Sequence, residues 1–241
     1  MDFNVLITVS KRTAYMPFFG MRLVDYVLAV VKSAEPQKVF IVCKDEKEKT
    51  YFEDLEDSTT ELVIGSEEAA NLKADDTPLL ILDGAMGKLT KKGLLAMVKW
   101  ADESGAKIMN HLKLPVSQES SIANSPKKLA EMIWSIQQDF NNKLMDSGVF
   151  IVDIATAYIC PLAKIGRNTI IYPNTIIDGA CEIGTDCIIG ANSHLINMKL
   201  GDGVHFKHSV GEKSEVGDFS QIGPFAYLRP NSKIGESCKI G

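Results

Sequence analysis

The side chains in this sequence that can do chemistry are few and widely spaced. No Cys-x-x-Cys spacing occurs, so we expect neither a zinc site nor a disulfide framework from the five cysteines Cys43, Cys160, Cys181, Cys187 and Cys238. Lys11 and Arg12 form an adjacent cationic pair after an apolar stretch, where they can hold a phosphate electrostatically. The alternative for such a pair is a solvated surface loop.

Composition narrows the class of protein. The 241 residues are 45% hydrophobic and 24% charged, which suits a folded core. The net charge is −5 and the sequence contains no run of Lys or Arg, so no nucleic acid is expected as a partner. Apolar runs such as 78–82 are far shorter than the ~20 residues of a membrane span. The N-terminal segment does not read as a signal peptide, and we expect a cytoplasmic protein without membrane contact.

The elements that must position these groups fall into two classes along the chain. The first 150 residues alternate apolar strand-like and helix-like segments, which predicts an α/β domain with a mostly parallel, Rossmann-like sheet. Strands are expected at 5–9, 38–43, 61–64, 79–82 and 106–109, and helices at 21–33, 46–55, 67–72 and 91–103. A longer helix follows, with Ser125 as its N-cap, Pro126 in its first turn and Gly148 after its end. We assign 1–124 to the α/β domain and 125–148 to this linker helix.

The remaining segment, 149–241, repeats with a period of six. It holds 11 of the 18 glycines. An aliphatic residue recurs every six positions from Ile159 to Leu195 and, after a slip near Leu200 and Phe206, again from Val210 to Ile240. Each hexad predicts one short strand and a corner of a triangular prism, with the aliphatic pointing inward and the following glycine supplying a positive φ. About five coils of a left-handed parallel β-helix are expected.

These residues resemble a known family. An α/β domain followed by hexapeptide repeats is the layout of the bacterial bifunctional N-acetylglucosamine-1-phosphate uridyltransferase / glucosamine-1-phosphate acetyltransferase. The resemblance is strongest from Asn142 onward and is carried by the segments 144–159, 165–179, 183–195, 200–210 and 222–235. It implies a nucleotidyltransferase-like domain and a left-handed β-helix. In the first 120 residues the resemblance is faint.

The uridyltransferase half of the family uses a glycine-rich loop whose backbone N–H groups approach the nucleotide phosphates. In the matching stretch, 7–15, both loop glycines are replaced, by Ser10 and Arg12, and the family arginine falls on Ala14. Lys11 and Arg12 are the cations left to contact a phosphate there. The resemblance therefore implies a degenerate nucleotide site.

The magnesium site of the family is altered as well. Its aspartate falls on Ala85, and Asp83 lies two residues earlier, where it is either a remnant ligand or a turn aspartate before Gly84. Asn124 falls near the family's second ligand, and one asparagine does not bind magnesium by itself. The family's sugar-binding lobe is reduced to 109–122. Magnesium is expected only if the family activity survives.

The acetyltransferase half keeps one matching residue. Arg229, within Leu228-Arg229-Pro230, matches the family arginine that contacts glucosamine 1-phosphate, and a guanidinium fork suits a phosphate. The alternative is a solvent-facing corner. None of the histidines His111, His194, His205 and His208 matches the family's catalytic base, and His205 and His208 are expected in loops at the slip. The acetyl-coenzyme A groove belongs to coils later than Gly241, so this cofactor too is expected only if the activity survives.

Three functions remain open at the level of sequence. The first is a shortened, non-catalytic relative that binds a sugar phosphate, a sugar nucleotide or a partner protein. The second is an active nucleotidyl- or acetyltransferase completed by a trimer neighbour or by a full-length homologue. The third is a purely structural β-helical unit. A homotrimer through the β-helix is expected, with an end-to-end dimer of open coils as the alternative.

Overall fold

The computed structural model of the chain describes residues 2–9, 17–65, 77–84, 86, 88–104, 108–110, 123 and 125–241. The chain forms two compact units. The first contains Met1–Phe18 and Arg22–Met132, and the second contains Phe19–Met21 and Ile133–Gly241. None of the described helices combines the length and apolar character that a membrane crossing requires.

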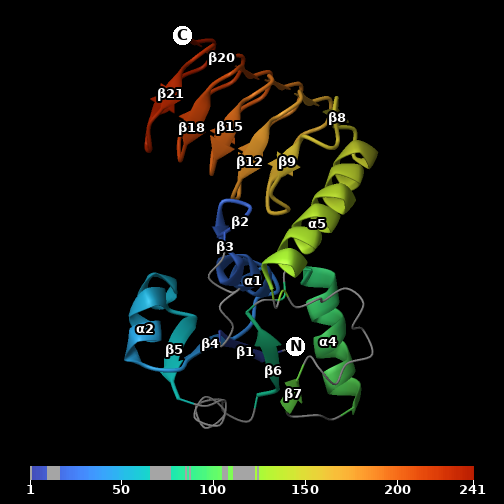
Figure 1. Ribbon diagram of the computed structural model, residues 1–241, viewed down its shortest axis with the longest axis vertical. Coiled ribbons are helices and arrows are strands. Elements are labelled where there is room, and N and C mark those ends of the chain that lie inside the picture. Colours follow the sequence, from blue (N-terminus) through green and yellow to red (C-terminus); the bar gives the residue numbers. More distant parts are fainter. Residues whose placement is uncertain are drawn as a thin grey trace. The chain divides into compact units, whose positions relative to one another are not determined.

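The first unit is built on a five-stranded parallel sheet. Its strand order is β5 (Thr60–Ile64), β4 (Lys38–Cys43), β1 (Asn4–Thr8), β6 (Leu79–Asp83) and β7 (Ile108–Asn110). Four of the five residues of β1 and all five of β6 are buried, which is typical of a parallel strand with both faces covered. Among its described residues, the helices that lie wholly within this unit are α1 (Leu23–Lys32), α2 (Glu46–Phe52) with a 3-10 turn η2 (Glu53–Leu55), and α4 (Lys91–Ser104) (Figure 1). The predicted parallel α/β class is confirmed.

The start of α1 differs from the prediction. Met21–Arg22 is strand β3, which pairs with β2 (Pro17–Phe18), and the helix begins at Leu23 rather than at residue 21. The backbone N–H of Arg22 donates to Asp25 at 2.9 Å, which closes the first turn of the helix. Apolar periodicity does not detect a two-residue hairpin. The expected helix at 67–72 and part of the strand at 106–109 lie outside the described residues.

The long helix α5 (Pro126–Asp146) begins and ends as predicted. Ser125 caps it, since its Oγ accepts from the N–H of Lys128 at 3.2 Å. The division between the two units falls within this helix, after Met132. Its second half covers the start of the β-helix: the side-chain amides of Gln137 and Asn141 both donate to the carbonyl of Ala157, at 2.9 Å each.

The second unit is a three-sided parallel β-helix, whose successive coils are visible in Figure 1. One sheet contains β10 (Lys164–Ile165), β13 (Glu182–Ile183), β16 (Lys199–Leu200), β19 (Glu215–Val216) and β22 (Lys233–Ile234). The second contains β8 (Phe150–Ile151), β11 (Ile170–Ile171), β14 (Ile188–Ile189), β17 (His205–Phe206), β20 (Gln221–Ile222) and β23 (Lys239–Ile240). The third contains β9 (Tyr158–Ile159), β12 (Ile176–Asp178), β15 (His194–Ile196), β18 (Val210–Glu212) and β21 (Tyr227–Leu228). We call them the 10–22, 8–23 and 9–21 sheets.

The predicted inward column is confirmed up to Leu195. The side chains from Ile159 to Leu195 at six-residue spacing line one core cluster, continued by Leu200, Phe206, Val216, Ile222 and Leu228. A second inward column was missed by the sequence analysis. It consists of small or short residues two positions earlier, among them Ala157, Thr169, Cys181, Ser193 and Ser220, all buried. Their small size lets the chain turn the corner of the prism.

The prediction for Val210 is wrong. Gly211, not Val210, pairs with the inward residues Leu195 and Leu228, while Val210 points outward and is 37% exposed. The coil is shorter here, because His194 pairs with Val210 sixteen positions later whereas Ile176 pairs with His194 eighteen positions later. A one-residue slip turns a side chain to the other face of a strand. Met198 and Phe206 occupy the space that a side chain at Gly211 would fill.

The expected role of the glycines is confirmed at Gly223, which has a φ of 90°, but needs correction in the 10–22 sheet. At the end of the 10–22 strands the positive φ lies two residues after the glycine, for example at Asn168 (63°) and Asp186 (57°). The glycines serve close stacking instead. A Cβ on Gly166 would lie 2.6 Å from the carbonyl of Gly184 on the next coil, a distance that no side chain tolerates. Gly201, Gly217 and Gly235 continue this column of glycines.

Candidate functional site

The carboxyl ends of β1 and β6 are the natural ligand edge of the first unit. In the strand order β5-β4-β1-β6-β7, strands β4 and β5 are added on one side of β1, and strands β6 and β7 are added on the other side. The direction of strand addition therefore reverses between β1 and β6. The crevice between two such strands is where open α/β sheets bind ligands. Thr8 ends β1 and is in register with Asp83, which ends β6. Of the sequence candidates, Asp83 therefore lies at this edge.

Asp83 is held firmly in this place. It is only 6% exposed, and the N–H of the following Gly84 donates to the carbonyl of Thr8 at 2.8 Å. The hydroxyl of Thr8 donates to the carbonyl of Leu82 at 3.2 Å. Lys11, Arg12, Ala85 and Asn124 lie outside the described residues, so their distances from Asp83 stay untested.

Arg229 directly follows β21 and is exposed. The preceding Leu228 is buried in the prism, which fixes the backbone at this corner. The hydroxyls of Ser214 and Ser232 both donate to the carbonyl of Arg229, at 2.7 Å each. Within the described part of the chain, no side chain pairs with its guanidinium. A fixed backbone and an unpaired guanidinium suit the binding of an anion.

Aromatic side chains lie close to Arg229 in the sequence and at the same end of the 9–21 sheet. Tyr227 is 57% exposed and Phe225 is 81% exposed, with the Phe225 ring edge-on to His208 at 4.9 Å between centroids. His208 adopts a positive φ of 44° in a turn, as expected for a loop residue. His205 was expected in a loop and lies instead in strand β17, paired with Ile188 and Gln221. Although the coil is shortened here, strand β17 stays in register with β14 and β20.

A paired aspartate and histidine on the 9–21 sheet escaped the sequence analysis. Nε2 of His194 donates to Oδ2 of Asp178 at 2.8 Å, from strand β15 to strand β12. Asp178 is 9% exposed, and within the described residues its buried Oδ1 has no hydrogen-bond partner. The two residues are 16 positions apart, and only the coil length brings them together. The carboxylate therefore orients the imidazole ring through Nε2.

The turn at Phe19–Met21 packs against Asp178 of this pair. The Phe19 ring stacks on Tyr158 with centroids 4.8 Å apart, and the N–H of Gly179 donates to the carbonyl of Phe19 at 3.2 Å. Gly20 has a φ of 73°, and a Cβ there would lie 2.5 Å from Cβ of Asp178. Burial, with a smaller effect from the charge of Asp178, raises the pKa of Tyr158 to about 12. Tyr158 is thus a neutral packing group under ordinary conditions.

The described residues do not fit a metal ion. Among them, no group of three or more His, Cys, Asp or Glu side chains converges on one point. The cysteines are no better suited, because burial raises the pKa of Cys160 to about 12 and that of Cys181 to about 11. Such thiols stay protonated and act as small core residues.

Known proteins resemble this chain in its repeats and beyond them. Residues 162–197 match the family model described as bacterial transferase hexapeptide (six repeats). The bifunctional protein GlmU of Geobacillus sp. (strain WCH70) is 40% identical over 139 residues, which make up 58% of this chain and 30% of that protein. The chain is similar to GlmU. The resemblance inferred from the sequence is therefore confirmed, as is the hexapeptide β-helix.

Other GlmU proteins give the same result. The bifunctional protein GlmU of Clostridioides difficile (strain 630) is 40% identical over 143 residues, or 56% of this chain and 31% of its own length. The chain thus spans under a third of each of these two relatives. Among solved structures, the acetyltransferase domain of PglB from Neisseria gonorrhoeae FA1090 aligns with 98% of this chain and 87% of its own, at 13% identity and a TM-score of 0.27. At so low a score nothing about function follows from that neighbour.

Proposed function

We propose that this transferase relative binds a sugar phosphate or a sugar nucleotide through Arg229 and does not carry out group transfer itself. The observation that carries the proposal is the exposed, unpaired guanidinium of Arg229 on a backbone fixed by Ser214 and Ser232. The similarity to GlmU supports a phosphorylated sugar as the ligand class, through the family match of Leu228-Arg229-Pro230.

The absence of transfer is proposed from the sequence at the family's catalytic positions. Ser10 and Arg12 replace the loop glycines, and Ala85 replaces the metal-binding aspartate. Loss of phosphate-loop and metal contributions removes most of the electrostatic stabilisation that phosphoryl transfer needs. None of the histidines matches the acetyl-transfer base of the family. Magnesium and acetyl-coenzyme A are proposed as cofactors only if the family activities survive.

A second candidate is an active transferase completed by another chain. The 40% identity to a bifunctional protein favours it. A neighbour in a homotrimer, or a full-length homologue, would supply the missing groups. Turnover assays with UTP and N-acetylglucosamine 1-phosphate, and with acetyl-coenzyme A and glucosamine 1-phosphate, separate the candidates. Turnover above about 1 per second, which is within the ordinary enzyme range, would establish the second.

We further propose that the β-helix forms a homotrimer, with prisms side by side. Hexapeptide repeats present flat sheets that can pack laterally, and the 9–21 sheet exposes the apolar side chains of Ile176, Val210 and Tyr227. Light scattering in 1 M salt tests the assembly: a mass near three times 26.4 kDa supports the trimer, and a mass near twice 26.4 kDa supports an end-to-end dimer.

The ligand proposal is tested by calorimetry with glucosamine 1-phosphate. A charge-assisted hydrogen bond contributes roughly 1.5–3 kcal/mol, so Arg229→Ala should weaken binding about tenfold to a hundredfold. Arg167→Ala, at another corner of the β-helix, is the matched control and should leave the affinity unchanged. Equal affinities of the two variants, or no binding by the unaltered protein, would remove Arg229 from the site.

A further inference from the structure

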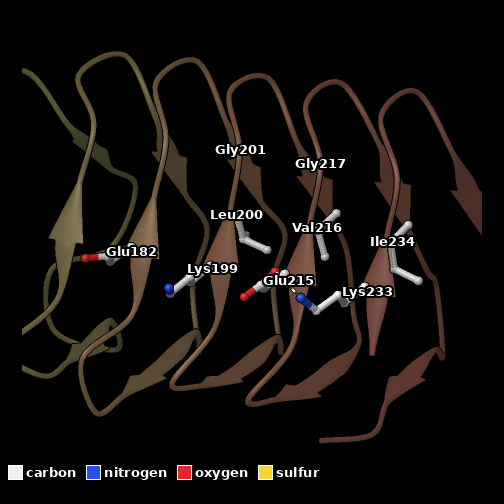
Figure 2. Close-up of a pocket in the computed structure, with 9 residues that line it drawn as sticks. All are labelled: Glu182, Lys199, Leu200, Gly201, Glu215, Val216, Gly217, Lys233 and Ile234. Carbon is white, nitrogen blue, oxygen red and sulfur yellow. Dashed lines mark ion pairs between the residues drawn. The ribbon is translucent and has the colours of Figure 1, made fainter. Parts of the chain in front are cut away.

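The outer face of the 10–22 sheet has a regular pattern of charge. Its five outward residues are in register across the strands and alternate in sign: Lys164, Glu182, Lys199, Glu215 and Lys233. Figure 2 shows the side chains of the last four on the same side of the sheet. They line a shallow hollow of about 490 Å³. Neighbouring strands lie about 4.8 Å apart, so four such levels span about 14 Å. We call the four residues Glu182, Lys199, Glu215 and Lys233 the charge ladder.

The pairs within one chain leave the ladder incomplete. Lys164 pairs with Glu182 at 3.0 Å, and Lys233 pairs with Glu215 at 3.4 Å. Lys199, between the two glutamates, forms no ion pair with any described residue. The lysines at the ends of the face are 78% and 77% exposed, so their ammonium groups extend into solvent. One central cation is therefore available to a carboxylate from outside the chain.

The order of charges in the ladder is self-complementary under one symmetry operation. A two-fold axis along the strands, midway between β16 and β19, reverses the order of the coils. It places Glu182 opposite Lys233 of a second copy and Lys199 opposite Glu215 of that copy. The two-fold axis repeats each of these pairs, so every residue of the charge ladder faces a residue of opposite charge on the second copy. An axis on β16 itself would put like charges opposite each other at every level.

From this geometry we infer that the 10–22 face is a surface on which two copies of this chain pair antiparallel, in the register that the charge ladder sets. Charge complementarity identifies the second copy as the occupant. The hollow at the centre of the ladder leaves room for the opposing side chains. Exposed ion pairs contribute little each, so the pairing is weak, reversible and sensitive to salt. This inference is independent of the proposed ligand.

Two single charge reversals test the pairing. Lys199→Glu puts like charges opposite each other at two levels, and so does Glu215→Lys; each variant should lose self-association in sedimentation velocity at low ionic strength. In an equimolar mixture of the two variants every level again faces the opposite charge, so the mixture should regain the doubled mass. The unaltered protein should lose it in 1 M salt, where the screening length falls to about 3 Å.

The controls separate this surface from other contacts. Lys239→Glu makes the same charge change on the 8–23 sheet and should keep the doubling. Should a reversal fail to fold, Lys199→Gln and Glu215→Gln carry the test, and each should weaken the association and its salt dependence. A trimer built on other faces would keep its mass in every variant. No concentration-dependent doubling of the unaltered protein, or a mixture that does not associate more than its components, would overturn the inference.

Discussion

At the scale of single residues, the β-helix depends as much on absent side chains as on present ones. Gly166, Gly184, Gly201, Gly217 and Gly235 stack on consecutive coils of the 10–22 sheet, and the first four approach the next coil more closely than a Cβ allows. At Gly166 and Gly217 the obstacle is backbone, which cannot rotate away. Gly235 differs, because a Cβ there would meet only the Sγ of Cys238, at 3.7 Å.

This contrast predicts the effect of adding one methyl group. Gly166→Ala should destabilise the protein by about 1–3 kcal/mol, because overpacking against backbone forces the coils apart. Gly235→Ala should be neutral or slightly stabilising, since the new Cβ has room and the unfolded chain loses entropy. Urea unfolding of the two variants measures the difference. Similar midpoints would show that the coils tolerate a side chain within this column.

The sequence reveals functional candidates that stand in a local motif, but not those that only the coil length brings together. Arg229 stands in a local motif, and the structure leaves its guanidinium exposed as a binding residue must be. Asp178 and His194 meet only because the coil length aligns strands β12 and β15, which no local spacing encodes. Val210 was placed inward because a period of six carries no information about a shortened coil.

At the scale of elements, periodicity predicted the repeating units better than their ends. The sheets of both units follow from apolar strands, while the β2–β3 hairpin has too few residues to show a period. The helix α5 was predicted from its caps, yet its role at the β-helix was not. Gln137 and Asn141 give their amide hydrogens to carbonyls that have no preceding coil to pair with. The helix therefore closes the first coil.

Adjacent asparagines on α5 test this closure. Asn141 is fully buried and donates to the carbonyls of Ile154 and Ala157, whereas Asn142 is exposed. Asn141→Ala should cost about 1–3 kcal/mol, because buried carbonyls lose their donor. Asn142→Ala, with the same chemical change, should stay within about 0.5 kcal/mol of the unaltered protein. Thermal unfolding gives the comparison, and hydrogen exchange at the first coil should quicken in the Asn141 variant alone.

At the scale of the whole molecule, the two compact units each carry buried thiols. Cys43 belongs to the first unit, where burial raises its pKa to about 11. Cys160 belongs to the second, where burial raises its pKa to about 12. A protonated, buried thiol does not react with alkylating reagents, so each cysteine becomes reactive only when its own unit opens.

Alkylation along a urea gradient, resolved by mass spectrometry, should therefore report two unfolding transitions. We expect Cys43 and Cys160 to become reactive at different urea concentrations, because separate cores need not melt together. Cys238 is partly exposed and serves as the control that reacts before either transition. One shared midpoint for Cys43 and Cys160 would instead describe a single cooperative molecule.

The shortened coil has a consequence for how this prism could be modified. All three sheets continue through it in register, although it has two residues fewer per turn than the coils before it. Chain length is thus absorbed at the corners, while the flat walls keep their hydrogen bonds. A corner such as the turn at Lys213 should then accept an inserted peptide without disturbing the walls on either side. The β-helix would serve as a rigid scaffold on which foreign loops can be displayed at chosen heights.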